Sequence, residues 1–170
     1  GITVSAPHDD YYPRIREICD RYDVLFIADE IITGFGRTGR TFAIEHWDVV
    51  PDLVVFGKGV TAGYIPLGGV LVSDTIRDTI DAYGAFPHVF TYVDNPVATR
   101  VASTVLDILD EENILEHVVE MGAYLESAAN RLYEHPIVGD IRVKGLMMGV
   151  ELVRDRETRA PFSADQKVSA

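Results

Sequence analysis

The feature that most constrains this chain is an apolar run that ends at a single lysine enclosed by glycines. Residues 54–56 are β-branched or aromatic, which indicates a short buried strand. Gly57 and Gly59 flank Lys58, and more glycines follow within a dozen positions, which indicates a tight turn. Because lysine is rarely buried without a reason, Lys58 is a candidate amine for a Schiff base with a carbonyl compound. The alternative is a solvated lysine in an ordinary loop.

A second apolar run gives that lysine a chemical partner. Residues 24–28 resemble a strand and are followed directly by Asp29 and Glu30. The spacing of 29 residues between Asp29 and Lys58 leaves room for one crossover connection between parallel strands. Ligands of open α/β sheets bind at the rim formed by the carboxyl ends of the strands. We therefore expect an α/β fold in which Asp29 and Lys58 lie at the same rim.

Composition excludes several classes of function. With 170 residues, of which 47% are hydrophobic, the chain can bury the core of one domain and part of another. A net charge of −12 argues against nucleic acid binding, and no apolar stretch has the length of a membrane span. Cys19 is the only cysteine, which excludes an intramolecular disulfide and a cysteine zinc cluster. Since neither end resembles a natural start or stop, we expect an internal fragment of a longer cytoplasmic protein.

The remaining elements are predicted from periodicity and capping residues. Asn95 and Pro96 form a helix start, and Asn113 with Glu116 resembles a capping box. We place a domain boundary near residues 109–113, which divides the chain into residues 1–110 and 111–170. Helices are expected over residues 9–22, 41–47, 74–83, 96–109 and 113–134, and extended segments over 24–28, 54–56, 70–72, 89–91, 137–143 and 146–153.

Two motif interpretations compete with a Schiff-base lysine. Residues 34–39 match G-x-G-x-x-G, but a dinucleotide site needs these glycines directly after a strand and at the start of a helix. Here five residues intervene, so a glycine loop that turns the chain is the better interpretation. The strand that ends at Asp29 also resembles the magnesium-binding strand of an ATPase. That function requires a phosphate-binding loop that ends in Lys-Ser or Lys-Thr, whereas Gly59 follows Lys58.

Several segments, in order and at similar spacing, strongly resemble the class III (ω-type) aminotransferases. These are fold type I enzymes that depend on pyridoxal 5′-phosphate (PLP), and the resemblance covers nearly the whole chain. It implies the second part of the large PLP-binding domain, with a mainly parallel sheet between helices, and the start of an α+β C-terminal domain. The segments are Asp29-Glu30-Ile31-Ile32-Thr33-Gly34-Phe35-Gly36-Arg37-Thr38-Gly39, Pro51-Asp52, Phe56-Gly57-Lys58-Gly59, Pro66-Leu67-Gly68, Phe90-Thr91-Tyr92 and Asn95-Pro96-Val97-Ala98.

The resemblance implies roles for four residues. Lys58 would bind PLP as a Schiff base and then transfer protons, and Asp29 would pair with the pyridine nitrogen of the cofactor. Ile31 matches the branched residue that packs on one face of the ring. Thr91 matches a threonine that reaches the cofactor phosphate of the neighbouring subunit, which implies a homodimer with a shared site. Glu30, like Arg37 and Arg40, is expected to hold loop structure.

The implied reaction moves an amino group from an amine or ω-amino acid to a 2-oxo acid such as pyruvate. Ile32 occupies a position where members acting on acetylornithine, ornithine or 4-aminobutyrate often have glutamine, which favours the pyruvate-using members. Asn95 occupies a position where the family usually has histidine. Because other parts of the family's site lie outside this sequence, we expect the fragment alone to be inactive. The alternatives are an aminomutase or decarboxylase of the same fold, or a remnant without catalysis.

Overall fold

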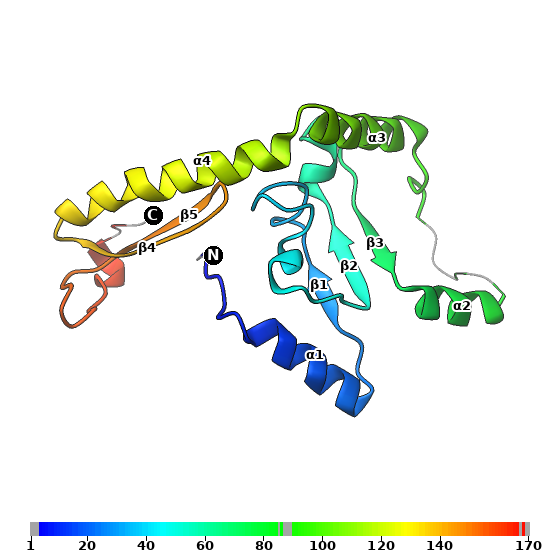
Figure 1. Cartoon of the computed structure of the whole chain (residues 1–170), viewed down its shortest axis with the longest axis horizontal. Coiled ribbons are helices and arrows are strands. Elements are labelled where there is room, and N and C mark those ends of the chain that lie inside the picture. Colours follow the sequence, from blue (N-terminus) through cyan, green and yellow to red (C-terminus); the bar gives the residue numbers. More distant parts are fainter. Residues whose placement is uncertain (1–3, 85, 87–89, 167, 169–170) are drawn as a thin grey trace.

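The structure is a computed structural model that describes residues 4–84, 86, 90–166 and 168. A three-stranded sheet with α1 beside it forms one part, and a two-stranded hairpin beneath a long helix forms the other (Figure 1). The helices are α1 (Tyr11–Tyr22), α2 (Asp74–Ala82), α3 (Pro96–Glu111) and α4 (Ile114–Ala129). The strands are β1 (Ile27–Asp29), β2 (Leu53–Phe56), β3 (Gly69–Val72), β4 (Val138–Lys144) and β5 (Met147–Leu152). Four 3-10 helices are η1 (Ala43–Trp47), η2 (Lys58–Thr61), η3 (Asn130–Glu134) and η4 (Ala164–Gln166).

The sheet has the order β1-β2-β3 and contains both kinds of strand pairing. β1 and β2 are parallel, with Asp29 opposite Val55, whereas β3 returns antiparallel to β2. β1 begins three residues later than the sequence predicts, because Val24 N–H donates to Cys19 C=O at the end of α1. The parallel pair confirms that the β1 and β2 segments end at the same rim of the sheet.

The register of β1 and β2 is established at their amino ends by Asp52. Its backbone N–H donates to Phe26 C=O at 2.9 Å, and its carboxylate accepts the Phe26 N–H at 2.7 Å. Arg16 of α1 donates to the same carboxylate oxygen at 2.7 Å. The hydrogen bond from Phe26 N–H, together with the Arg16 guanidinium, holds the pKa of the Asp52 carboxyl below its usual range. One side chain thus joins α1 to the start of both parallel strands.

A small core lies behind these strands, between α1 and η1. Its buried members are Phe26, Ile44 and Val49. Tyr12 of α1 stacks on Phe26 at 6.1 Å between ring centroids and meets Trp47 edge-on at 4.8 Å. This packing covers the face of β1 that holds Ala28 and Glu30, which are 8% and 3% exposed. Since successive strand side chains alternate in direction, Asp29 points the other way and is exposed.

The two predicted helix starts in the second half have different outcomes. Asn95 caps α3 as predicted, because its side-chain oxygen accepts from the backbone N–H groups of Val97 and Ala98. The predicted capping box at Asn113 is wrong, because this residue adopts a left-handed conformation (φ 51°) and its side chain makes no capping hydrogen bond. Asn113 instead turns the chain between α3 and α4, near the expected domain boundary. α4 ends at Ala129 and continues as η3 to Glu134, where the sequence predicts a single helix.

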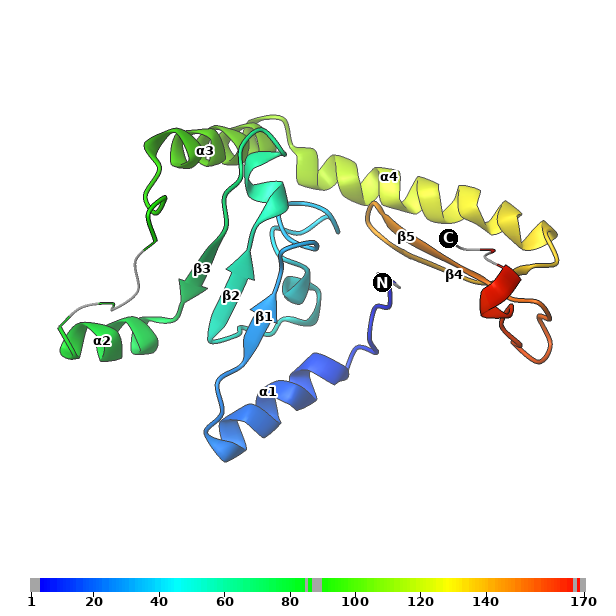
Figure 2. The same ribbon diagram turned by 180° about the vertical axis from the view of Figure 1, so that it is seen from behind.

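The second part of the molecule is the β4–β5 hairpin and α4, which lies along it. The hairpin pairs Ile141 with Val150 and turns at Gly145, as predicted. Both views show α4 running the length of the hairpin, while α3 lies above the three-stranded sheet (Figures 1 and 2). Among the described residues, none of the helices combines the length and the apolar character needed to cross a membrane.

Replacing Asp52 with alanine should weaken the sheet near the site. The variant leaves the Phe26 N–H without its side-chain acceptor, which should destabilise the folded state by about 1–3 kcal/mol. Asp20→Ala is the matched control, because Asp20 contacts the same Arg16 at the surface and should contribute less than about 1 kcal/mol. Thermal unfolding of the whole protein measures both.

The pH dependence of this contribution has a defined sign. Because the pKa of Asp52 is lower in the folded state, its contribution is present above about pH 4, the ordinary pKa of an aspartate. This stabilisation is lost as the pH falls below that value. Equal thermal unfolding midpoints for Asp52→Ala and Asp20→Ala at neutral pH would contradict the role of Asp52.

Candidate active site

The parallel strands bring the two candidate catalytic side chains to one rim. Asp29 is the last residue of β1, and Lys58 begins η2 two residues after β2 ends at Phe56. Adjacent strands of a sheet lie about 5 Å apart, so the two segments leave the sheet side by side. Both residues line one cleft with a volume of about 610 Å³. The sequence prediction that Asp29 and Lys58 share a rim is therefore confirmed.

Lys58 is presented by an unusual backbone turn. Gly57 is fully extended, and Lys58 itself has a left-handed conformation (φ 41°), which few side chains other than glycine, asparagine and aspartate adopt readily. Thr61, the last residue of η2, is buried, and its hydroxyl donates to Ile65 C=O at 2.6 Å. Lys58 is exposed, and it also lines a second hollow of about 560 Å³ whose wall includes Thr61 and Ile65. The turn therefore leaves the Lys58 side chain accessible to solvent.

Ile31 contacts the Asp29 carboxylate and lies close to the turn that presents Lys58. Its backbone N–H donates to the Asp29 carboxylate (Oδ1) at 3.1 Å, so the carboxylate and the turn after β1 hold each other in place. A Cβ atom at Gly57 would lie 3.7 Å from Ile31 Cγ2, which places the Ile31 side chain beside the turn that presents Lys58. The half-buried isoleucine therefore adds an apolar surface to the cleft that Asp29 and Lys58 also line.

Glu30 forms a polar center behind this rim. Its carboxylate accepts the Ala43 N–H at 3.0 Å, the Ile44 N–H at 2.8 Å and the hydroxyl of Thr33. The expectation that Glu30 holds loop structure is confirmed. The sequence offered little sign of its burial, since an acidic residue beside Asp29 also suits a solvated strand end.

The G-x-G-x-x-G segment turns the chain and does not start a helix. Phe35, Gly36 and Gly39 have positive φ angles of 55°, 87° and 84°. The Phe35 N–H donates to Thr41 C=O and the Gly36 N–H to Arg40 C=O, which closes the segment on itself. η1 begins only at Ala43. The geometry of a dinucleotide site is absent from this segment, and the loop interpretation is confirmed.

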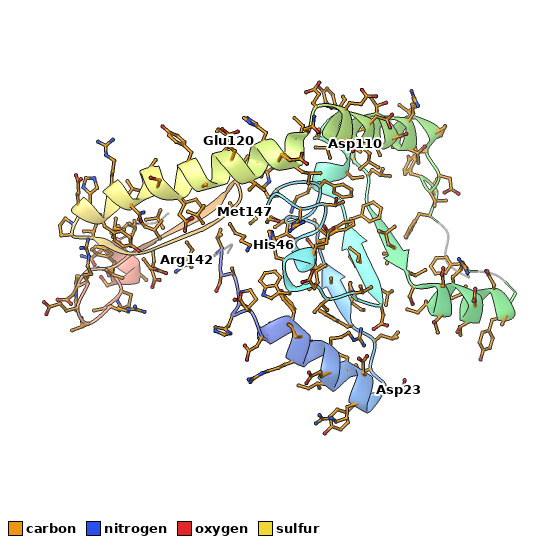
Figure 3. All side chains as sticks on the ribbon, in the orientation of Figure 1. Asp23, His46, Asp110, Glu120, Arg142 and Met147 are labelled. Atoms are coloured by element: carbon orange, nitrogen blue, oxygen red, sulfur yellow. The ribbon has the colours of Figure 1, made fainter. Side chains whose placement is uncertain are left out.

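The same glycine loop makes close contact with the second part of the molecule. The Leu146 N–H donates to Arg37 C=O at 3.0 Å, and a Cβ atom at Gly145 would lie 2.5 Å from Thr38 Cα. Gly122 of α4 also lies close to this turn, since a Cβ atom at Gly122 would lie 2.9 Å from Gly145 Cα. Figure 3 labels Met147 of the hairpin and His46 of η1 in the region where the two parts of the molecule meet. The hairpin therefore contributes Lys144 and Met147 to the wall of the cleft.

A half-buried histidine lies in this junction. The ring of His46 hydrogen-bonds through Nε2 to the backbone oxygen and the hydroxyl of Thr38, both at 3.1 Å. Burial, reinforced by the nearby Lys144 ammonium, lowers the pKa of His46. Lys144 also lies over the ring of Trp47 at 5.6 Å. Within the described residues, no group of three or more acidic, histidine or cysteine side chains could hold a metal ion.

Thr91 does not join the other predicted site residues. It is exposed in a turn at residues 91–94 that precedes the Asn95 cap, and among the described lining residues it belongs to neither cleft that Lys58 lines. The described residues 90–95, which lead into α3, lie on the far side of the three-stranded sheet from the hairpin (Figures 1 and 2). Part of the extended piece expected at residues 89–91 lies outside the described residues.

Comparisons with known proteins point to one family. The family model described as aminotransferase class-III matches residues 2–168. A putrescine–pyruvate aminotransferase of Pseudomonas aeruginosa is 47% identical over 161 residues, which cover 94% of this chain and 35% of the relative. A taurine–pyruvate aminotransferase of Bilophila wadsworthia is 37% identical over 169 residues, which cover 96% of this chain and 37% of the relative. This chain therefore spans about a third of the length of these curated relatives.

Solved structures give the same result for the fold. The crystal structure of an (S)-enantioselective ω-transaminase from Thermomicrobium roseum has a TM-score of 0.92 and 47% identity, covering 96% of this chain and 37% of that protein. A transaminase from a marine Virgibacillus has a TM-score of 0.91 and 47% identity, covering 95% of this chain and 37% of the other. These neighbours confirm the predicted α/β fold class.

A methyl group at Gly145 should detach the hairpin from the glycine loop. Gly145→Ala places a Cβ atom against the Thr38 backbone at a positive φ of 57°. Gly84→Ala is the matched control, because Gly84 also has a positive φ (99°) but nothing lies within 4 Å of its Cβ position. Both variants carry the strain of the left-handed backbone, about 1 kcal/mol. Only Gly145→Ala should speed hydrogen exchange at Leu146, and equal exchange in the two variants would contradict the close contact.

Proposed function

This chain belongs to the class III aminotransferase family, and from that premise we propose that it forms part of the active site of a PLP-dependent transaminase. The observation that carries the proposal is the presence of an exposed carboxylate, Asp29, and an exposed amine, Lys58, at the ends of two paired parallel strands. Because the chain spans 35–37% of its relatives, the site would be completed by residues elsewhere in the whole protein.

The residues at the rim fit the chemistry of PLP. When bound, this cofactor supplies an aldehyde that condenses with an amine and a pyridine ring that accepts electrons. Lys58 offers the amine, and the extended Gly57 leaves the neighbouring backbone open to close approach. Asp29 offers an acceptor for a protonated ring nitrogen. Ile31 offers an apolar surface for one ring face.

Asp29 and Lys58 would then have different roles in the reaction. The Asp29 carboxylate, fixed by the Ile31 N–H, would keep the ring nitrogen protonated and so make the ring a better electron acceptor. The Lys58 amine would bind the cofactor and, once released by the incoming amine, hold and return the proton of the substrate carbon. Lys58 is exposed and lines two hollows, which suits an amine that must both bind the cofactor and transfer a proton.

The proposed substrates are an amine or ω-amino acid as donor and pyruvate as acceptor. Relatives named for putrescine, for taurine and for pyruvate support this class of substrate without selecting one donor. The alternatives are an aminomutase, a decarboxylase and a protein without catalysis. A screen of amine donors with pyruvate, with 2-oxoglutarate and without acceptor separates them. Amino-group transfer that requires pyruvate supports the proposal, whereas carbon dioxide release or turnover without acceptor would contradict it.

We also propose that the whole protein is a homodimer with a site shared between subunits. Thr91 lies in an exposed turn away from Asp29 and Lys58 of its own chain. That position suits a hydroxyl donor to the cofactor phosphate of a second copy. Asn95 caps α3 and so fixes the turn that contains Thr91, which gives this residue a structural role where the family usually has histidine.

Asp29→Asn should keep PLP bound and slow transamination strongly. Loss of the charged partner lowers the pKa of the ring nitrogen, and each unit corresponds to about 1.4 kcal/mol, or about tenfold in rate. Asp23→Asn is the control, because Asp23 is an exposed aspartate at the end of α1. Single-turnover kinetics measure the effect. A rate for Asp29→Asn equal to that of the control would refute the proposed role.

Thr91→Ala should weaken PLP binding without changing the dimer. Thr91→Ser retains the hydroxyl and should restore affinity, which separates the hydrogen bond from packing. The loss of one hydrogen bond to a charged group is expected to cost about 1.5–3 kcal/mol. Equilibrium titration with PLP and light scattering measure affinity and mass. A fully active monomer, or unchanged affinity in Thr91→Ala, would contradict the shared site.

A further inference from the structure

Asp29 depends on a short strand that has few constraints of its own. β1 contains only three residues, and within the described residues it pairs with β2 alone. The side chains of such a strand alternate between its faces, so a small rotation at its end would redirect the Asp29 carboxylate. The hydrogen bond from the Ile31 N–H fixes the Asp29 carboxylate relative to the turn that follows β1. It does not fix that turn relative to the rest of the protein. Another group must fix the direction of the strand end.

Glu30 has the contacts needed to fix it. The residue is 3% exposed, and a buried carboxylate is tolerated only when hydrogen-bond donors surround it. Its side chain accepts from Thr33 on one side of the glycine loop and from Ala43 and Ile44 on the other. An apolar side chain of similar size would leave two buried N–H groups without acceptors, which is costly.

The backbone of Glu30 adds two further hydrogen bonds. Its N–H donates to Val55 C=O at 2.8 Å and extends the pairing of β1 with β2 beyond Asp29. Its C=O accepts the Gly34 N–H at 2.9 Å and closes the turn that contains Ile31. Glu30 is 3% exposed and Asp29 is exposed, so the two side chains leave opposite faces of the strand end, and both residues line the cleft.

We propose that Glu30 is a positioning residue for Asp29: its buried carboxylate, held by Thr33, Ala43 and Ile44, fixes the strand end so that Asp29 faces the ring nitrogen of the cofactor. This inference rests on the proposed PLP function. Glu30 touches neither the cofactor nor the substrate in this account and acts through Asp29. The consequence is that a change at Glu30 should alter the ionisation of the bound cofactor, and not only the stability of the fold.

The test uses the whole protein loaded with PLP. The absorption of the cofactor is recorded as a function of pH, and the midpoint of its change reports protonation of the nitrogen bonded to Lys58. Asp29→Asn should raise this midpoint. Without the Asp29 carboxylate the ring nitrogen loses its proton and positive charge, and that charge no longer disfavours protonation of the nitrogen bonded to Lys58. Glu30→Gln should raise it too, by up to about one pH unit, or tenfold in the ratio of the two forms. Glu45→Gln is the matched control, because Glu45 is an exposed carboxylate that accepts the Phe42 N–H in the same segment.

The double variant distinguishes positioning from a general structural role. If Glu30 acts through Asp29, the Asp29→Asn/Glu30→Gln protein should have the midpoint of Asp29→Asn alone. Thr33→Val removes one of the three donors and should raise the midpoint less, in the same direction, and it serves as the test if Glu30→Gln does not fold. Thermal unfolding without PLP records the stability of each variant separately.

The inference is overturned if Glu30→Gln lowers stability but keeps the wild-type midpoint, or if its shift adds to that of Asp29→Asn. Failure of the proposed function gives a different result, because the wild-type protein would then show no absorption change with PLP at any pH. In that case the inference about Glu30 falls with it. A midpoint shift in Glu45→Gln equal to that in Glu30→Gln would also overturn it.

Discussion

The parallel pairing of β1 with β2 is the interaction on which the candidate site depends. Asp29 and Lys58 are far apart in sequence, and they meet only because the ladder aligns Asp29 with Val55. Asp52 sets this register at one end of the strands through Phe26, and the Glu30 N–H continues it at the other through Val55 C=O. A slip of one residue would exchange the directions of Asp29 and Glu30. The Asp29 carboxylate would then point into the core, and the Glu30 carboxylate would be exposed in its place.

The loop from Gly34 to Gly39 connects this rim to the rest of the molecule. Its base is closed by the Glu30 carboxylate, and its tip contacts the turn of the β4–β5 hairpin at Gly145. Three glycines permit this approach: Gly39 lies against α4, and Gly122 and Gly145 lie against each other. The hairpin and α4 therefore pack directly against the loop whose base is closed by Glu30. The hairpin also supplies Lys144 and Met147 to the cleft, so both parts of the chain border the candidate site.

The sequence predicted those features that leave a local signal. Apolar runs ending at Asp29 and Lys58 indicated two strands and their common rim, and the Asn95-Pro96 pair indicated the start of α3. The burial of Glu30 could not be predicted, because its donors lie up to 14 residues away and depend on the folded loop. Asparagine is common both as a helix N-cap and in the left-handed backbone conformation, so the sequence did not decide between them at Asn113. In the structure Asn113 is left-handed and forms the turn between α3 and α4. The roles of Ile31 and Thr91 follow only from resemblance to the family, since neither the apolar surface nor a second subunit has a sequence pattern of its own.

The proposed site depends most directly on the attachment of PLP to Lys58. Borohydride reduction of the PLP-loaded whole protein, followed by peptide mass spectrometry, would fix the cofactor to the amine that binds it. Lys167 lies outside the described residues, and Lys144, which also lines the cleft, is the internal control. The account predicts a pyridoxyl group on Lys58 and none on Lys144. A label on Lys144 or on any lysine other than Lys58 would contradict the arrangement of Asp29 and Lys58 around one cofactor.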